Sequence, residues 1–405
     1  MKYQTIIEVS KKRLIWFAVL FWYFEMEYLS TISIINRTYT ALKLLGIIFL
    51  LLNIKRISLN KMFLAISAIE ISVWFSTFRM GTPISSTTMA VFRVLVFCVI
   101  IDTMMKKDAR ACIDVLYSIM ELLIVLNVLS MLLFPNGLYD PDNLGPTAIK
   151  KYYLLGHQNS MGIYALVGIT LGGLRCIYDK SIMFKWRFII LVALSFFYDI
   201  KVWSVISIIG LGGVTALILF DFLTNKGIKL HLVAGIVFNT ILFVLIVIEQ
   251  NVAFLSQLIS NVFHRDITFS GRTVIWQKAI LSFLREPIWG VGNGQGKLIF
   301  GVVTAHNRYL NTLFTSGTVG FVLLIVVFLL LSFKLKDLRK QPVRILTYYF
   351  IVLLTVMQGE SYVGMPFYVL IVVAYRLEEI VVAVKDENIS KKSRFAVLWP
   401  SHYST

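Results

Sequence analysis

Long apolar stretches alternate with short polar connections along almost the whole chain. A helix of roughly 20 apolar residues crosses about 30 Å of hydrocarbon and satisfies its own backbone hydrogen bonds. The pattern therefore predicts an all-α polytopic membrane protein with about twelve transmembrane helices. We place them near residues 14–35, 39–54, 62–78, 84–104, 113–134, 158–177, 183–199, 202–221, 230–248, 308–333, 343–358 and 363–381.

Two connections are much longer than the others and divide the chain. Residues 1–248 form a predicted N-terminal membrane bundle of about nine spans, which includes the polar loop 135–157. A large loop covers 249–307, the C-terminal spans cover 308–381, and a tail covers 382–405. Long loops without spans of their own are usually functional, so we expect the chemistry beside the two long loops.

The composition and the charge pattern agree with this architecture. Charged residues make up 15% of the 405 positions and hydrophobic residues 58%, whereas soluble domains are about 25% charged. The net charge of +17 does not indicate nucleic-acid binding, because Lys and Arg lie in short clusters such as "KKR" (11–13) and "KLKDLRKQPVR" (334–344). These clusters occupy every second connection. The positive-inside rule therefore predicts that they and both termini are cytoplasmic, and that the two long loops are on the exported face.

The large loop contains a predicted amphipathic helix over residues 271–285. The residues on its apolar face are Trp276, Ala279, Ile280, Phe283 and Leu284, while Lys278 and Arg285 share the polar face. Arg272 falls within the apolar stripe, almost above Trp276, so its guanidinium is expected to point into the protein. Two interpretations remain open: Arg272 binds an anionic ligand, or it snorkels or pairs with a carboxylate such as Asp266.

The glycine run "WGVGNGQG" (289–296) resembles a nucleotide-binding loop only superficially. A P-loop requires a glycine at 291 and a serine or threonine at 298, where this chain has Val291 and Leu298. The remaining interpretation is a tight turn whose glycines allow another segment to approach closely.

His306 opens the tenth predicted span in "AHNRYLNTLF" (305–314), directly before Asn307. One interpretation is simple anchoring of the span at the membrane interface. The other is chemical, because two arginine-bearing loops converge nearby and an unperturbed imidazole titrates near operating pH.

Three further ionisable residues are candidates. Arg93 lies near the middle of the fourth predicted span, where an ionisable group faces a partner or a polar cavity. A structural ion pair with Glu70 or Glu121, at similar depth, is the alternative. Lys201 lies in a very short exported turn, and Glu360 is predicted on the same face.

The resulting candidates are several cations, a histidine and few carboxylates at one membrane interface. The chain contains no HExxH and no CxxC motif, which argues against metal-dependent chemistry. Guanidinium groups hold carboxylates and phosphates through forked hydrogen bonds. The pattern therefore favours an anionic, phosphate-bearing substrate and requires neither a metal nor a cofactor.

Three segments in order resemble the signature of the bacterial O-antigen polymerase and ligase superfamily. They are "SGRTVIW" (270–276), "EPIWGVGNG" (286–294) and "AHNRYLNTLFTSGTVGF" (305–321). The signature consists of an arginine-bearing helix, a P-I-x-G-x-G turn and an H-N-x-x-L segment that opens a span. "GHQNSMGIYAL" (156–166) is similar to the Asn-Gly segment of that superfamily, and Lys201 stands where it has the basic residue of a Ser-Arg-Thr or Ser-Lys-Thr triplet.

The resemblance implies an all-helical bundle similar to the GT-C glycosyltransferases, in the bacterial cytoplasmic membrane. It implies metal-independent glycosyl transfer on the outer face of that membrane, with an undecaprenyl-diphosphate-linked oligosaccharide as donor. An acceptor sugar hydroxyl attacks the anomeric carbon, and undecaprenyl diphosphate leaves.

The resemblance also implies roles for individual residues. Arg272, with help from Arg93 and from Lys201 or Arg265, would stabilise the diphosphate as it departs. His306 would orient or deprotonate the acceptor hydroxyl, and Glu360 is a second candidate base. The remaining members of the expected substrate-binding set are Asn307, Trp276 and Asn159.

The implied function is polymerisation of repeat units into a surface polysaccharide such as O-antigen, capsule or exopolysaccharide. The alternative is a ligase that moves finished glycan to lipid A core or to a wall acceptor. The composition leans toward Lys, Ile and Asn, which is typical of a low-GC genome. Lipid A, the acceptor of the ligase, would be absent from such an organism, so the composition favours the polymerase. A transporter is disfavoured, because the two halves show no internal repeat. Expected partners are the lipid-linked donor, the glycan acceptor, membrane lipid, a flippase and a chain-length regulator, and no nucleic acid.

Overall fold

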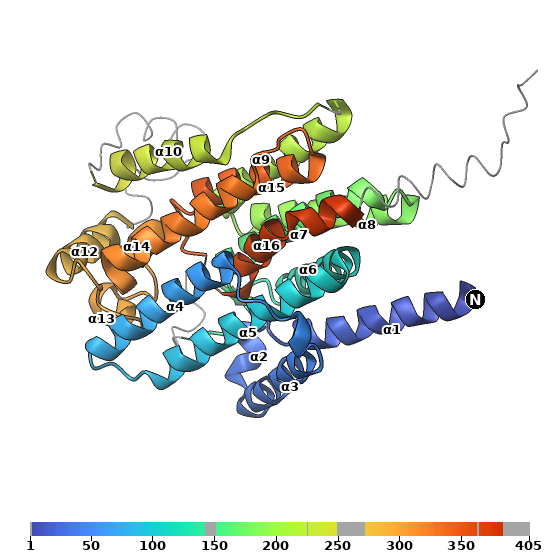
Figure 1. Ribbon diagram of the computed structural model, residues 1–405. Coiled ribbons are helices and arrows are strands. Elements are labelled where there is room, and N and C mark those ends of the chain that lie inside the picture. The colour runs from blue at the N-terminus through green and yellow to red at the C-terminus, as the bar shows by residue number, and fades with distance from the viewer. Residues whose placement is uncertain (1, 142–150, 225, 249–271, 363, 384–405) are drawn as a thin grey trace, which may run out of the picture.

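The computed structural model describes residues 2–141, 151–224, 226–248, 272–362 and 364–383. Within these ranges almost all regular structure is helical, and one two-stranded hairpin supplies the strands. Figure 1 shows the long helices side by side in one bundle, with their axes running in broadly similar directions.

The first half of the bundle contains α1 (Lys2–Phe21), α2 (Glu27–Thr31), α3 (Ser33–Leu52), η1 (Ile54–Arg56), α4 (Lys61–Arg79), α5 (Ser85–Lys107) and α6 (Ala109–Leu133). The antiparallel hairpin β1 (Tyr152–Tyr153) and β2 (Gly156–His157) follows, and η2 (Gln158–Ser160) leads into the next helix. The second half contains α7 (Met161–Tyr178), α8 (Ile182–Lys201), α9 (Val205–Thr224), α10 (Leu232–Phe243), η3 (Val244–Ile248), α12 (Arg272–Arg285), α13 (Gly296–Phe300), α14 (Arg308–Lys334), α15 (Gln341–Val356) and α16 (Met365–Tyr375).

Polar side chains mark the beginnings of several helices. Asn60 accepts a hydrogen bond from the Phe63 amide at the start of α4, and Asp108 caps α6 through the Ala111 amide. Such caps satisfy amide groups that have no partner within the helix. Asn60 and Asp108 thus fix where α4 and α6 begin.

Seven helices in the described ranges are long and apolar enough to cross a membrane: α3, α4, α5, α6, α7, α9 and α14. Three shorter apolar helices cover Leu232–Val247, Gln341–Val356 and Met365–Tyr375. The chain is therefore a multi-pass, all-α membrane protein. The count of twelve spans and the likeness to the GT-C fold stay predictions.

The beginning of the chain departs from the predicted spans. A single span was expected over 14–35, but α1 ends at Phe21 and α3 begins only at Ser33. The apolar pattern continues through the turn, so hydropathy alone does not reveal it. Glu25 lies in this turn and pairs with Lys43 and Arg93, which gives the interruption a tertiary cause.

Helix α7 runs through the centre of the bundle, where every residue from Met161 to Leu174 is buried. It packs against α6, α8, α9, α15 and α16 (Figure 1). A Cβ atom added at Gly172 would lie 2.4 Å from the ring of Phe188, so glycine is needed there for the close contact with α8.

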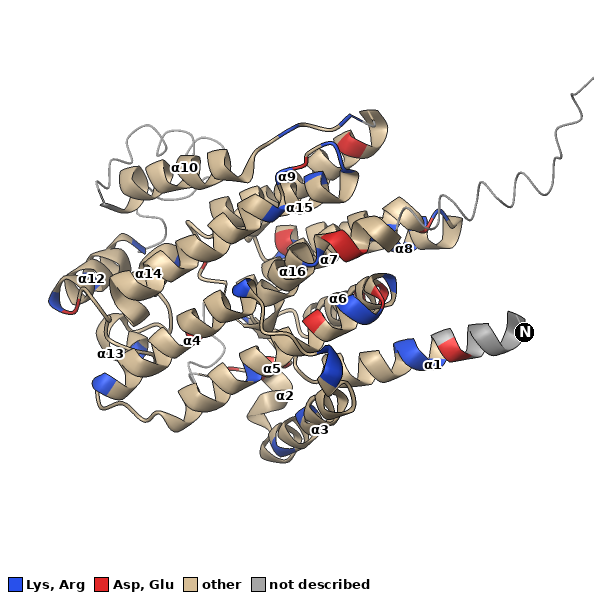
Figure 2. Ribbon diagram, viewed as in Figure 1, with Lys and Arg blue, Asp and Glu red and all other residues tan. Residues whose placement is uncertain are grey.

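Figure 2 shows that Lys and Arg gather mainly at helix ends and in connections, while the middle parts of most helices are free of them. We call the end of the bundle that carries the β1–β2 hairpin and the first turns of α7 and α14 the hairpin end. The other end, where α7 finishes and α8 begins, is the opposite end.

Candidate functional site

A cavity of about 690 Å³ lies at the hairpin end. Segments that are far apart in the sequence supply its walls, including the turn after α1, helices α4 and α5, η2, the beginning of α14 and the loop after α15. Polar side chains that line it include Glu25, Glu70, Arg93, Asn159, His306, Arg308 and Glu360. A concave site with convergent polar groups is where ligand chemistry is expected.

Glu360 joins three of the residues predicted from the sequence. The Arg272 Nη2 and the Asn159 Nδ2 each donate to Glu360 Oε1 at 2.9 Å. The His306 Nδ1 lies 3.7 Å from Glu360 Oε2, within ion-pair distance but too long for a hydrogen bond. We call Glu360, Arg272, His306 and Asn159 the Glu360 cluster.

The charges around Glu360 favour its ionised form. Burial alone would raise the pKa of this carboxyl, since its residue is only 6% exposed. The interactions with His306 and Arg272 outweigh burial, so the pKa lies below the ordinary value of 4.5. The cluster therefore keeps the Glu360 carboxylate ionised next to the imidazole.

His306 is held in a backbone conformation that most side chains avoid, with φ of 51°. Positive φ is uncommon outside glycine, and it persists when neighbouring contacts fix the chain. Here the Trp276 Nε1 donates to the Ala305 carbonyl at 3.0 Å, and the Asn307 Nδ2 donates to the Gln358 carbonyl at 2.9 Å. The peptide group before His306 and the side chain of the residue after it are thus anchored.

These contacts give Trp276 and Asn307 a different place from the one expected. Both were predicted to bind substrate, but neither lines the cavity. Trp276 is 1% exposed and Asn307 is fully buried, where its side chain also caps α14 through the Leu310 amide. Their contribution to the site is to hold the His306 backbone.

Arg272 points into the protein, as the phase of its helix predicted. Its Nη1 donates to the Gly359 carbonyl in addition to the Glu360 contact. Arg272 does not line the cavity, and its expected alternative partner, Asp266, lies outside the described residues. On the same helix Leu284 was predicted on the buried face but is 63% exposed, because the buried contact narrows to Trp276 and Ala279.

The glycine turn packs against a break in α14. Gly317 has φ of 62° and interrupts the helix, which leaves backbone groups on either side without helical partners. The Val291 and Gly292 amides donate to the Phe314 and Thr315 carbonyls at 2.8 and 3.0 Å. A Cβ atom on Gly290 would lie 2.6 Å from the Phe314 carbonyl oxygen, so the predicted close approach is a backbone-to-backbone contact.

The same turn is fastened to α4. The Asn293 amide donates to Thr77 Oγ1 at 2.9 Å, and the Ser76 hydroxyl donates to the Gly290 carbonyl at 3.1 Å. Arg79 at the end of α4 forms an ion pair with Glu286. The segment between α12 and α13 is therefore attached to two helices of the bundle.

Arg93 lines the cavity but does not join the Glu360 cluster. Its Nη1 contacts Glu25, which also binds Lys43. The alternative of an ion pair with Glu70 or Glu121 is wrong, because the carboxylate partner comes from the turn after α1. Arg93 and Arg272 thus belong to two separate charge clusters.

The cavity contains more carboxylates than the sequence suggested. Glu25, Glu27, Glu70 and Glu360 all line it, so the expectation of few carboxylates at this interface is wrong. The sequence did contain a signal for the first two. Glu25 and Glu27 fell inside a predicted span, where ionisable residues are costly and usually functional.

Two predicted binding residues remain outside the site as described. Lys201 ends α8, is exposed, and does not line the cavity. Arg265 lies outside the described residues.

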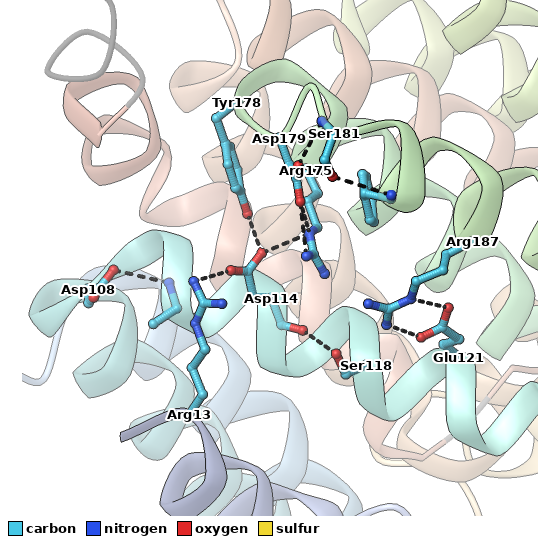
Figure 3. Close-up of polar contacts among 12 residues, drawn as sticks. Arg13, Asp108, Asp114, Ser118, Glu121, Arg175, Tyr178, Asp179, Ser181 and Arg187 are labelled. Carbon is cyan, nitrogen blue, oxygen red and sulfur yellow. Dashed lines mark hydrogen bonds and ion pairs between the residues drawn. The ribbon is translucent and has the colours of Figure 1, made fainter. Parts of the chain in front are cut away.

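A second polar cluster lies at the opposite end of the bundle (Figure 3). Asp114 of α6 contacts Arg13 at 2.6 Å, the Arg175 Nε at 3.1 Å and the Tyr178 hydroxyl at 3.0 Å. The Arg175 guanidinium also stacks on the Phe184 ring, with 4.2 Å to its centroid. We call Asp114, Arg13, Arg175 and Tyr178 the Asp114 cluster; none of them lines the 690 Å³ cavity.

Comparison with protein families gives a match over part of the chain. Residues 154–325 match the Wzy_C family model, which is described as O-antigen ligase. This match confirms the resemblance to the O-antigen polymerase and ligase superfamily over the matched residues. Glu360 and Arg93 lie beyond the matched segment. Comparison with curated proteins gives no match.

Proposed function

We propose that this membrane protein transfers a glycan from an undecaprenyl-diphosphate-linked donor to a sugar hydroxyl, and that it thereby polymerises repeat units of a surface polysaccharide. The observation that carries the proposal is that His306 lines the cavity with its Nδ1 3.7 Å from the Glu360 carboxylate, which lines the same cavity. A carboxylate behind an imidazole fixes its orientation and stabilises its protonated form.

In the proposed reaction the acceptor hydroxyl oxygen attacks the anomeric carbon of the donor. A carbon–oxygen bond forms to the acceptor, and the bond between the anomeric carbon and the phosphate oxygen breaks. His306 takes the hydroxyl proton, and the undecaprenyl diphosphate leaves with the bonding electron pair. Glu360 stabilises the imidazolium, while Arg272 and Asn159 hold Glu360 in place.

The reaction is proposed for the outer face of the bacterial cytoplasmic membrane. The basic connections at the opposite end of the bundle support cytoplasmic placement of that end under the positive-inside rule. The hairpin end and the cavity then face the exported side, where a flippase and a chain-length regulator would act with the protein.

A ligase is the second candidate, and the description of the matched family favours it. The two activities differ in their acceptor. A polymerase extends the glycan when a lipid-linked repeat unit is the only substrate, whereas a ligase requires a separate acceptor such as lipid A core or a wall polymer.

The test uses the purified full chain in lipid nanodiscs with a synthetic prenyl-diphosphate-linked repeat unit. We expect a ladder of longer lipid-linked glycans without any added acceptor, and a rate about 10²- to 10⁴-fold lower in His306→Ala, the range for loss of a general base. The matched control is His231→Ala, which removes an exposed histidine at the start of α10.

Three outcomes separate the candidates. A ladder without added acceptor supports the polymerase. Product that forms only with a wall or core acceptor replaces the polymerase by the ligase. Equal rates for wild type and His306→Ala, at equal protein levels, would remove His306 from the mechanism. In cells, the proposal expects single unextended repeats on the lipid carrier in the His306→Ala strain.

A further inference from the structure

Arg308, the first residue of α14, lines the cavity directly after His306 and Asn307. It is only 9% exposed. Among the residues that the structure describes, none forms a hydrogen bond or an ion pair with its guanidinium, and its Nε is buried without any partner. The guanidinium lies over the Phe367 ring, with 5.0 Å from the guanidinium carbon to the ring centroid.

An unpaired guanidinium in this position is costly. A buried charge normally carries a partner, because removal from water costs several kcal/mol. The neighbouring cations follow that rule: Arg93 and Lys43 share Glu25, and Arg272 binds Glu360. The contact with Phe367 supplies only part of the compensation that Arg308 requires.

The charge of Glu70 interacts with that of Arg308. It lines the same cavity from α4, but it forms no ion pair with Arg308. Instead Glu70 accepts a hydrogen bond from the Tyr368 hydroxyl of α16. Arg308 therefore keeps forked donors for a group that enters the cavity.

The surroundings of Arg308 also favour an anion. The positive end of the α14 helix dipole lies at its first turn, and helix N-termini commonly bind phosphate. Asn311 and Thr312 follow Arg308 by three and four residues, so they share its face of the helix, and both line the cavity. A charge, a helix end and two polar side chains thus converge on one place.

We propose that Arg308 is a phosphate-binding residue that holds the diphosphate of the lipid-linked substrate beside His306. The identity of the ligand rests on the proposed function. The observation that the Arg308 guanidinium has no hydrogen-bond or ion-pair partner among the described residues does not. In this assignment Arg308 stabilises the charge of the departing diphosphate, and Arg272 acts one step removed by holding Glu360. This assignment gives Arg272 a different role from the one that the sequence resemblance implied.

The direct test measures binding of farnesyl diphosphate and of inorganic pyrophosphate to the purified full chain in nanodiscs of zwitterionic lipid. Loss of a charge-assisted, forked hydrogen bond should weaken farnesyl diphosphate binding about 10- to 100-fold in Arg308→Gln. The affinity of Arg308→Lys for farnesyl diphosphate should lie between those of the wild type and Arg308→Gln, because lysine keeps the charge but lacks the forked donors. Arg285→Gln, which removes an exposed arginine of α12, should bind as the wild type does.

A second set of variants separates binding from a purely structural role. If Arg308 served only to balance Glu70, then Arg308→Gln combined with Glu70→Gln would recover both stability and binding. Our proposal expects the double variant to regain stability but to remain about 10- to 100-fold weaker for farnesyl diphosphate. The double variant also keeps the test valid if Arg308→Gln alone fails to fold.

The outcomes distinguish this inference from the proposed function. Unchanged farnesyl diphosphate binding in the folded Arg308 variants overturns the inference and leaves the proposed function standing. No binding of farnesyl diphosphate by the wild type counts against the donor class and so against the proposed function. In a separate measurement phosphatidylglycerol is added to the nanodiscs. If Arg308 controls binding of this anionic lipid and not of farnesyl diphosphate, the site serves a membrane lipid and the substrate assignment is wrong.

Discussion

The two polar clusters lie near opposite ends of α7 and are built from similar parts. Asn159, in the Glu360 cluster, lies in η2, which leads into α7. Arg175 of the Asp114 cluster lies about 20 Å along α7, at 1.5 Å per residue. Each cluster surrounds one buried carboxylate with guanidinium and neutral donors. The difference lies in what else the side chains contact.

In the Asp114 cluster the charges neutralise one another and aromatic rings cover them. Both carboxylate oxygens of Asp114 have donors, and Arg175 bonds to Asp179 as well as stacking on Phe184. Such a network specifies how α1, α6 and α7 fit together. In the Glu360 cluster the imidazole lines a cavity and its backbone is strained, which is typical of functional sites.

The largest expected difference concerns activity. Glu360→Gln keeps the shape of the side chain but removes the charge behind His306, so the glycosyl transfer rate should fall about 10²- to 10⁴-fold. The rate is measured with lipid-linked repeat units in nanodiscs. Glu286→Gln, which breaks a partly exposed ion pair with Arg79 at the same end, is the control and should change the rate little. Normal activity in Glu360→Gln would show that the Glu360 cluster, like the Asp114 cluster, has only a structural role.

The second prediction concerns stability. Asp114→Asn removes the charge that pairs with Arg13 and Arg175, and breaking a buried pair costs about 3–5 kcal/mol. Unfolding in detergent should therefore occur at a clearly lower denaturant concentration, while the transfer rate per folded molecule stays the same. Asp337→Asn, in an exposed pair with Arg339, is the comparison. Loss of activity in folded Asp114→Asn would show that the opposite end participates in the reaction.

The third prediction concerns the fork of Arg272. Arg272→Lys retains the charge but cannot reach both the Gly359 carbonyl and Glu360 in the same geometry. We expect a transfer rate about 10- to 100-fold lower, the usual cost of loosening a residue that orients a functional group. Arg285→Lys on the same helix should be neutral. An unchanged rate would show that the orientation of Glu360 by Arg272 does not matter for the reaction.

The smallest expected effect is a dependence of stability on pH. The pKa of Glu360 in the folded protein is below 4.5, so its ionised form stabilises the fold above the pKa of the unfolded chain. That contribution falls as pH drops through the folded pKa. The stability difference between wild type and Glu360→Gln should be constant above about pH 5 and shrink in more acidic buffer. If the stability difference instead grows on acidification, the pKa of Glu360 is raised by folding and not lowered.

Sequence reasoning located the helices better than their limits. The long apolar run expected over 308–333 became α14 with nearly the same ends, because length and hydropathy decide membrane insertion. The expected span over 14–35 failed, because apolar residues continue through a turn that Glu25 stabilises from outside its own helix. Local patterns carry no information about such partners.

The site was predictable where local geometry was sufficient. Helical phase turned Arg272 inward, and the motif order placed it in the same region as His306. Glu360 was only a second candidate, because its three partners come from segments 54 to 201 residues away. The pairing of Arg93 with Glu25 and the lack of a partner for the Arg308 Nε among the described residues depend equally on tertiary packing.

The repair of α14 has a consequence for how the chain enters the bilayer. A gap at Gly317 would expose bare peptide groups to hydrocarbon, yet Thr318 and Val319 donate to the carbonyls of Pro287 and Ile288 at 2.8 and 3.2 Å. The segment with Pro287 and Ile288 is synthesised about 30 residues before Gly317. Its carbonyl groups are therefore already available when the interrupted helix α14 is synthesised and enters the lipid.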